Sequence, residues 1–207
     1  MSKRDLCHDI RSYLVLKRKI DSRELQPKAF YEDHQPCPSQ KSSSFYAGGD
    51  DGDLQEGVAW PNPPFSDNGD GTVTDNLTGL IRLQDANCFG QRTWPDGLSA
   101  CNSLAAESCG LNDGSVAGDW RLPNVRELNS LIHYGFSEPA LPDTAGTAQW
   151  TAGNPFFKVL SEWYWSSTTV VISTDLAWLV RFKTGIVSWG NKGNDELAYV
   201  WCVRGGQ

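Results

Sequence analysis

The pattern of apolar and polar positions predicts two helices that are followed by antiparallel strands. Apolar residues recur at helical spacing in 94–107, and a second helix is expected after Asn124, with Glu127 placed as in a capping box. A β-hairpin is predicted ahead of the helices, at 72–74 and 80–83. Later strands are predicted at 163–168, 176–182, 186–189 and 199–204. Helices early and strands late favour an α+β domain.

The first 45 residues differ from the remainder in charge and composition. They carry nine Lys and Arg against six Asp and Glu, whereas residues 46–207 carry nine against nineteen. We predict an N-terminal extension or linker at 1–45 and one domain at 46–207. The apolar stretch 13–16 is too short for a secretion signal. A different start codon is the alternative, which would leave a true signal peptide outside this sequence.

Composition and motifs exclude several classes of protein. The acidic domain argues against nucleic-acid binding, and no apolar run is long enough to span a membrane. Nine Trp, eight Phe and six Tyr argue against a disordered chain. The sequence contains no G-x-S-x-G, G-x-G-x-x-G or P-loop motif. We therefore expect no enzymatic activity, and the oligomeric state stays open.

Acidic residues in the predicted hairpin suggest one metal site. Asp67, Asp70 and Asp75 supply the hard oxygen ligands that calcium prefers, and the pattern begins like an EF-hand loop. No Glu stands at the closing position, and no flanking helices are indicated. Calcium is thus the one possible cofactor, and an Asx-rich turn without metal is the favoured alternative.

Four of the six cysteines lie in the predicted domain, at 88, 101, 109 and 202. Pairing Cys88 with Cys109 would close a local loop, and pairing Cys101 with Cys202 would tie the start of the domain to its end. Four cysteines allow three connectivities, and the sequence alone does not choose among them. Free thiols and a metal site are the alternatives to disulfides.

The late strands and their loops are rich in aromatic residues, which stack on sugars and anchor protein partners. We expect Trp120, Trp165, Trp178 and Trp201 to face the core. The loops 168–175 and 188–199 are predicted to lie exposed at one end of the sheet and to form a contact surface with the apolar run 169–172. The candidate ligand-binding residues are Arg181, Lys183, Trp189, Lys192, Asn194, Glu196 and Tyr199.

Five motifs follow one another in the chain, at 48–61, 67–80, 118–123 with 127–128, 164–168 and 203–206. In this order they resemble the Lcl C-terminal domain family, which is named for the C-terminal domain of the Legionella collagen-like adhesin. The resemblance covers about residues 46–207, and Arg82 stands where Trp is common in similar hairpins. The sequence has no collagen-like repeat and lacks the Glu-Pro-Asn and Gln-Pro-Asp motifs of calcium-dependent lectins.

The resemblance implies a C-type-lectin-like domain with two helices and a twisted antiparallel sheet, related in architecture to formylglycine-generating enzymes. It implies the disulfide between Cys101 and Cys202, extracytoplasmic or cell-surface display, and non-enzymatic binding of a glycan or a protein surface. Glycosaminoglycan adhesion is reported for the namesake. The alternatives are a scaffold that displays variable loops and, less favoured, an enzyme of the formylglycine-generating type.

Overall fold

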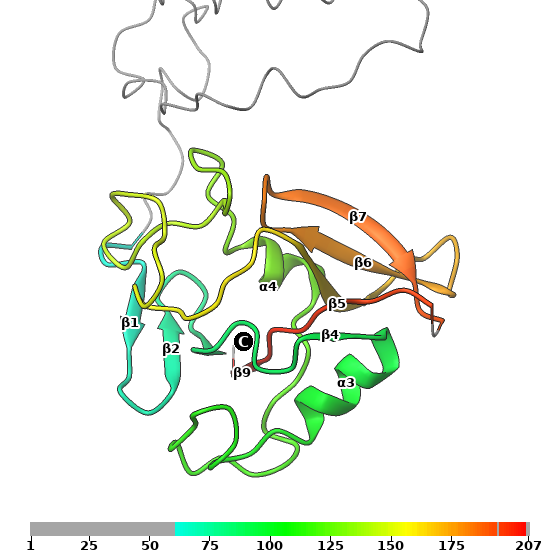
Figure 1. The fold of residues 1–207 in the computed structure, drawn as a ribbon, viewed down its shortest axis with the longest axis horizontal. Coiled ribbons are helices and arrows are strands. Elements are labelled where there is room, and N and C mark those ends of the chain that lie inside the picture. Colours follow the sequence, from blue (N-terminus) through cyan, green and yellow to red (C-terminus); the bar gives the residue numbers. More distant parts are fainter. Residues whose placement is uncertain (1–60, 194, 206–207) are drawn as a thin grey trace, which may run out of the picture. The chain divides into compact units, whose positions relative to one another are not determined.

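Residues 61–193 and 195–205 of the chain are described here from a computed structural model. They form an α+β arrangement of two helices and two β-sheets, which confirms the predicted class (Figure 1). The predicted extension 1–45 and the candidate residue Asn194 lie outside the described residues. No helix in the described part of the chain is both long and apolar enough to cross a membrane.

The first sheet contains the predicted hairpin and the end of the described chain. Its strands are antiparallel neighbours in the order β1-β2-β3-β9. The turn between β2 and β3 closes where the backbone N–H groups of Thr78 and Gly79 donate to the carbonyl of Asp75. The strands are β1 (Phe65–Asp67), β2 (Thr72–Asp75), β3 (Leu80–Leu83) and β9 (Val203–Gly205).

The second sheet holds the aromatic-rich strands, in the order β4-β8-β5-β6-β7. Its pairings are antiparallel except for a single parallel register pair between β5 and β8. Strand β7 lies at one edge of this sheet and has only β6 as a neighbour. The strands are β4 (Gln91–Arg92), β5 (Trp163–Thr169), β6 (Leu176–Arg181), β7 (Ile186–Asn191) and β8 (Ala198–Tyr199).

The single strand predicted at 199–204 is wrong, because this segment contributes to both sheets. Its beginning pairs in the second sheet as β8, and its end pairs in the first sheet as β9. The three residues between the strands, Val200, Trp201 and Cys202, are almost fully buried. Trp201 donates its indole N–H to the carbonyl of Leu83 in β3, at 2.7 Å. An unbroken apolar run therefore marks a crossing between two sheets and not one long strand.

Both predicted helices form, and both are shorter than predicted. Helix α3 spans Trp94–Asn102, and helix α4 spans Val125–Asn129. Thr93 caps α3 by accepting a hydrogen bond from the backbone N–H of Asp96. Asn124 and Glu127 form the predicted capping box of α4. Leu131 and Ile132 lie beyond the end of α4 and are nevertheless buried, so the predicted apolar stripe belongs partly to a turn.

The core is built around large aromatic side chains that connect the two sheets. Trp120, Trp165 and Trp201 are almost fully buried, as predicted. The Trp201 ring packs edge-on against Phe156, with ring centres 4.9 Å apart. Trp178 was also predicted to face inward, but it is only half-buried.

Two disulfide bonds join α3 and its surroundings to the rest of the domain. Cys101 in α3 bonds to Cys202, and their Cα atoms lie 5.5 Å apart. Cys88 bonds to Cys109, with Cα atoms 5.6 Å apart. The structure thus selects one of the three possible connectivities, the one suggested above. It confirms the pairing that the family resemblance implied for Cys101 and Cys202.

Candidate functional site

The loops predicted to form a contact surface do meet at one end of the second sheet. We call this region the loop end and define it as residues 170–175 between β5 and β6 together with residues 192–193 and 195–197 after β7. In Figure 1 these two segments lie beside each other, beyond the arrowhead of β7. The backbone N–H of Lys192 donates to the carbonyl of Asp175 at 2.8 Å, which joins the two segments directly.

Lys192 fixes the loop end through its side chain as well. Its ammonium group donates to the hydroxyl of Thr169 at 2.6 Å and to the carbonyl of Thr174 at 2.9 Å. It also lies 4.3 Å from the centre of the Trp94 ring, at the start of α3. A lysine over an indole face is attracted electrostatically. Lys192 therefore holds both loops against α3, and its ammonium group is engaged within the domain.

Two aliphatic side chains project from the loop that Lys192 holds. Val171 is 92% exposed and Ile172 is 95% exposed. Their neighbour Val170 is buried at 3%. The predicted apolar surface is thus limited to the two residues at the tip of the turn, because Val170 anchors the loop in the core.

An exposed indole lies on the strand that leads to the loop end. Trp189 in β7 is 56% exposed, and its register partner in β6 is the half-buried Trp178. Residues directly opposite on neighbouring strands share one face of a sheet. The two indoles therefore lie side by side on one face, and Trp178 is half-buried because this face is open to solvent beside Trp189.

The structure separates the candidate residues that the sequence grouped together. Arg181 lies at the far end of β6 from the loop end, with its guanidinium 5.6 Å from the centre of the Trp163 ring. Lys183 lies just beyond β6 and pairs with Glu138 at 2.7 Å. Arg181 and Trp178 are three positions apart on one strand, so their side chains point to opposite faces. Arg181 and Trp189 consequently cannot belong to one compact site.

Two other candidate residues serve the fold. The Tyr199 ring in β8 is half-buried, and its centre lies 5.6 Å from that of the buried Tyr164. The carboxylate of Glu196 accepts a hydrogen bond from the backbone N–H of Asn191 at 2.6 Å. Tyr199 is therefore only partly exposed, and its ring packs against the aromatic core.

The calcium hypothesis is not supported, because the three aspartates have separate partners. Asp67 accepts from Gly69 and from the Gln84 amide, and Asp70 accepts from the backbone and hydroxyl of Thr72. Asp75 is buried in an ion pair with Arg82. Within the described ranges, no group of three or more His, Cys, Asp or Glu residues is arranged to hold a metal ion. The alternative, an Asx-rich turn, describes the hairpin.

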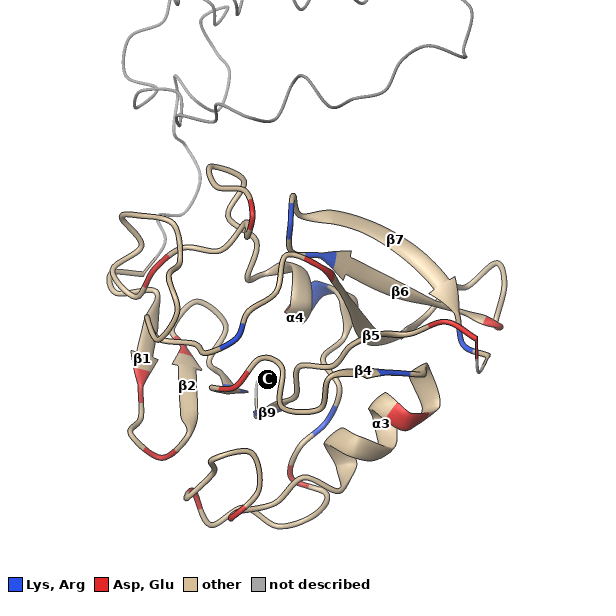
Figure 2. Cartoon of the chain, in the orientation of Figure 1, with Lys and Arg blue, Asp and Glu red and all other residues tan. Residues whose placement is uncertain are grey.

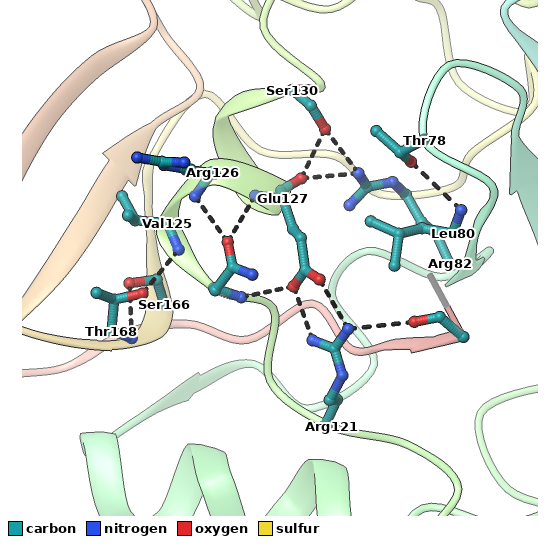
Figure 3. Close-up of polar contacts among 12 residues, drawn as sticks. Thr78, Leu80, Arg82, Arg121, Val125, Arg126, Glu127, Ser130, Ser166 and Thr168 are labelled. Atoms are coloured by element: carbon teal, nitrogen blue, oxygen red, sulfur yellow. Dashed lines mark hydrogen bonds and ion pairs between the residues drawn. The ribbon is translucent and has the colours of Figure 1, made fainter. Parts of the chain in front are cut away.

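A buried polar cluster joins the first sheet to α4, which contacts strands β5 and β6 of the second sheet. The Arg82 side chain in β3 is only 1% exposed and pairs with Asp75 at 2.8 Å. It also donates to the backbone carbonyl of Glu127 at 2.7 Å and to the hydroxyl of Ser130 at 3.1 Å. Figure 3 shows this guanidinium reaching the last turn of α4 from the side of β3. Arg82 therefore fastens the hairpin to the helix.

A second arginine approaches the same helix through the carboxylate of Glu127 (Figure 3). Arg121 binds it in bidentate fashion, with both N···O distances at 2.7 Å. The backbone N–H of Asn124 donates to the same carboxylate at 2.8 Å. Burial by itself would raise the pKa of Glu127, but these hydrogen bonds outweigh it, so the pKa is lowered from its usual 4.5. Glu127 is thus held as a carboxylate at neutral pH.

The lowered pKa of Glu127 predicts a pH-dependent stability. Because the folded-state pKa lies below the unfolded value, the contribution of this carboxylate is complete above that value and is lost as the pH falls through the folded pKa. Urea unfolding of the wild type and of Glu127→Gln should differ at about pH 6 and converge towards about pH 3. An equal difference at both pH values would contradict this assignment.

Sequence reasoning missed two of these interactions. The sequence contains a sign of the first, since Arg82 replaces a Trp that is common in similar hairpins, but its partner Asp75 is considered there only as a turn residue or a possible calcium ligand. The second, the contact between Lys192 and Trp94, joins residues about a hundred positions apart and leaves no local pattern. Only the folded chain shows that both cations are structural.

The sequence was also compared with known proteins. A search of curated proteins finds no match. The model of the family described as Lcl C-terminal domain matches residues 71–204, which is more than half of the chain and includes most of the described residues. The matched range contains both disulfide bonds, the polar cluster at α4 and the loop end. The chain therefore belongs to the Lcl C-terminal domain family.

Proposed function

We propose that this chain is a non-enzymatic binding module with a C-type-lectin-like fold, which recognises a protein surface or a glycan through its loop end. Membership of the Lcl C-terminal domain family supports a surface-protein module. Two disulfide bonds are in keeping with a location outside the cytoplasm, where such bonds persist. The absence of a recognisable catalytic motif in the sequence favours binding over catalysis.

The observation that carries the proposal is the exposed pair Val171 and Ile172. Two β-branched aliphatic side chains at a turn are almost entirely in water, while Lys192 and Val170 hold that turn in place. A fixed loop loses little conformational entropy when it binds. Burying each of these side chains against a partner would contribute roughly 1.5–3 kcal/mol. This arrangement suits contact with an apolar part of a protein surface.

A glycan is the second candidate ligand, and one observation favours it. Trp189 presents more than half of its surface to solvent beside Trp178, and aromatic faces are common platforms for sugars. In this case Trp189→Ala should weaken binding and the change of Val171 and Ile172 should not. A scaffold without a ligand of its own would show neither effect.

Binding should depend on the two exposed aliphatic residues. We expect the double variant Val171→Ser and Ile172→Ser to lose most of its affinity for the partner, because the apolar contact is removed while the fold is kept. The variant should melt close to the wild-type temperature, since surface changes are usually mild. Immobilising the variant and the wild type on beads, and then measuring binding to a panel of purified cell-surface proteins and to a glycan array, tests both ligand classes.

The matched control is Val116→Ser, which makes the same chemical change at a valine that is 63% exposed and lies outside the loop end. This variant should bind like the wild type. If both variants lose binding equally, or if the loop-end variant binds normally to every ligand that the wild type binds, the loop end is not the contact surface.

A further inference from the structure

Strand β7 exposes one edge of the second sheet. The N–H of Lys192 donates to the carbonyl of Asp175, which extends the β6–β7 ladder by one hydrogen-bonded pair beyond Leu176 and Asn191. Opposite residues of an antiparallel pair alternate between hydrogen-bonded and non-hydrogen-bonded pairs. Val187 and Trp189 therefore direct their backbone N–H and C=O groups away from β6, and no partner for them is found among residues 61–193 and 195–205.

The free stretch of this edge is short and has two definite ends. The outward N–H of Asn191 is already bonded to the Glu196 carboxylate. At the other end, the strand is preceded by a turn residue, Gly185, which has a φ of 76°. The free stretch thus runs from Ile186 to Gly190, and its central residue is Ser188.

The free edge lacks the features that usually prevent pairing between proteins. Edge strands are commonly protected by charged residues or proline. Strand β7 contains neither, and Figure 2 shows no Lys, Arg, Asp or Glu along it. Ile186 and Trp189 are both more than half exposed. An uncharged strand with free backbone groups fits another uncharged strand.

We propose that β7 pairs with β7 of a second copy of this chain, in antiparallel orientation about a two-fold axis at Ser188. In this register the outward backbone groups of Val187 bond to those of Trp189 in the second copy, and those of Trp189 bond to those of Val187 in the second copy. The two five-stranded sheets become one continuous sheet. A two-fold axis at the centre of the free stretch uses all of its unpaired groups in both copies.

The side chains fit this register. On one face, Val187 of each copy lies opposite Trp189 of the other. The symmetry makes two such pairs, so the exposed Val187 and Trp189 side chains of both copies are covered. On the other face the axis passes between two serines. Ile186 lies opposite Gly190, over which the Glu196 carboxylate of the same copy lies. No pair of large side chains therefore meets at the axis.

A cysteine at position 188 tests the axis directly. Ser188 forms a non-hydrogen-bonded pair with itself, for which the Cα atoms lie about 4.5 Å apart, close enough for a disulfide. In full-length chain with Cys7→Ser and Cys37→Ser, mild oxidation of Ser188→Cys should give mostly cross-linked dimer. The matched control is Ser99→Cys, an exposed serine on α3, which should stay mostly monomeric. Equal cross-linking of the two variants overturns the proposal.

Opposite charges at the axis give a second test in solution. Wild type should approach twice the chain mass in sedimentation equilibrium as concentration rises. Ser188→Lys and Ser188→Glu should each remain at one chain mass, because like charges meet at the axis, and an equal mixture should dimerise again. Melting curves show that each variant is folded. A wild type that stays monomeric, or a mixture that does not dimerise, overturns the proposal. The β7 edge would then be available for pairing with a strand of another protein.

Discussion

Replacing Cys101 and Cys202 together by Ala should lower the free energy of unfolding by about 4–5 kcal/mol. This bond joins residues 101 positions apart, so its loss releases a long loop in the unfolded chain. Both cysteines are fully buried, and their truncation also leaves unfilled space in the core. Guanidinium-induced unfolding of the oxidised wild type and the variant, followed by tryptophan fluorescence, measures the difference.

The matched control is the pair Cys88→Ala and Cys109→Ala. This bond spans only 21 positions and both cysteines are half-buried, so the expected loss is about 3 kcal/mol. The prediction is that loss of the Cys101–Cys202 bond costs more stability than loss of the Cys88–Cys109 bond, because it closes the longer loop. A larger loss from the short-range bond would mean that packing around Cys88 matters more than loop closure.

Replacing Arg82 by Met should destabilise the domain by about 3–5 kcal/mol, because the Asp75 carboxylate would be left buried without its cation. Asp75 is 2% exposed and cannot reach bulk water without rearrangement of the hairpin. The change also removes the donors to Glu127 and Ser130 that fasten the hairpin to α4. Urea unfolding at neutral pH measures the loss.

Two variants show whether the buried charge is the cause. Adding Asp75→Asn to Arg82→Met should restore part of the stability, because the amide is neutral and its oxygen still accepts from Leu77 and Thr78. Arg121→Met should cost about 1 kcal/mol or less, since the Arg121 side chain is 41% exposed. If Arg121→Met costs as much as Arg82→Met, burial of the charge does not explain the effect.

These two predictions concern the interactions that hold the binding loops in place. The Cys101–Cys202 bond ties α3 to the chain segment that crosses between the sheets, and Trp94 at the start of α3 supports Lys192. The Arg82 cluster fixes α4, and Val125 at the N-terminus of α4 donates its backbone N–H to the hydroxyl of Thr168 near the end of β5. The loop end therefore rests on two helices that are each fastened by a long-range interaction.

The fold class and most of the local elements can be predicted from short-range patterns in the sequence. The Asn124–Glu127 capping box and the Gly79 turn of the hairpin are set by residues a few positions apart, so a local pattern suffices to find them. The family followed from ordered motifs. The positions of the exposed loops followed from the apolar run beside Asn- and Gly-rich segments, because core space for such residues is limited.

Which charged and aromatic residues serve the fold and which face solvent is visible only once the chain is folded. Arg82 and Asp75 look like surface residues in the sequence, and their burial depends on α4, which is more than forty positions away. Tyr199 and Trp189 have the same character in the sequence, but one strand packs against Tyr164 and the other forms an open edge. Burial and pairing depend on contacts between distant segments, and the pattern of a single segment carries no information about them.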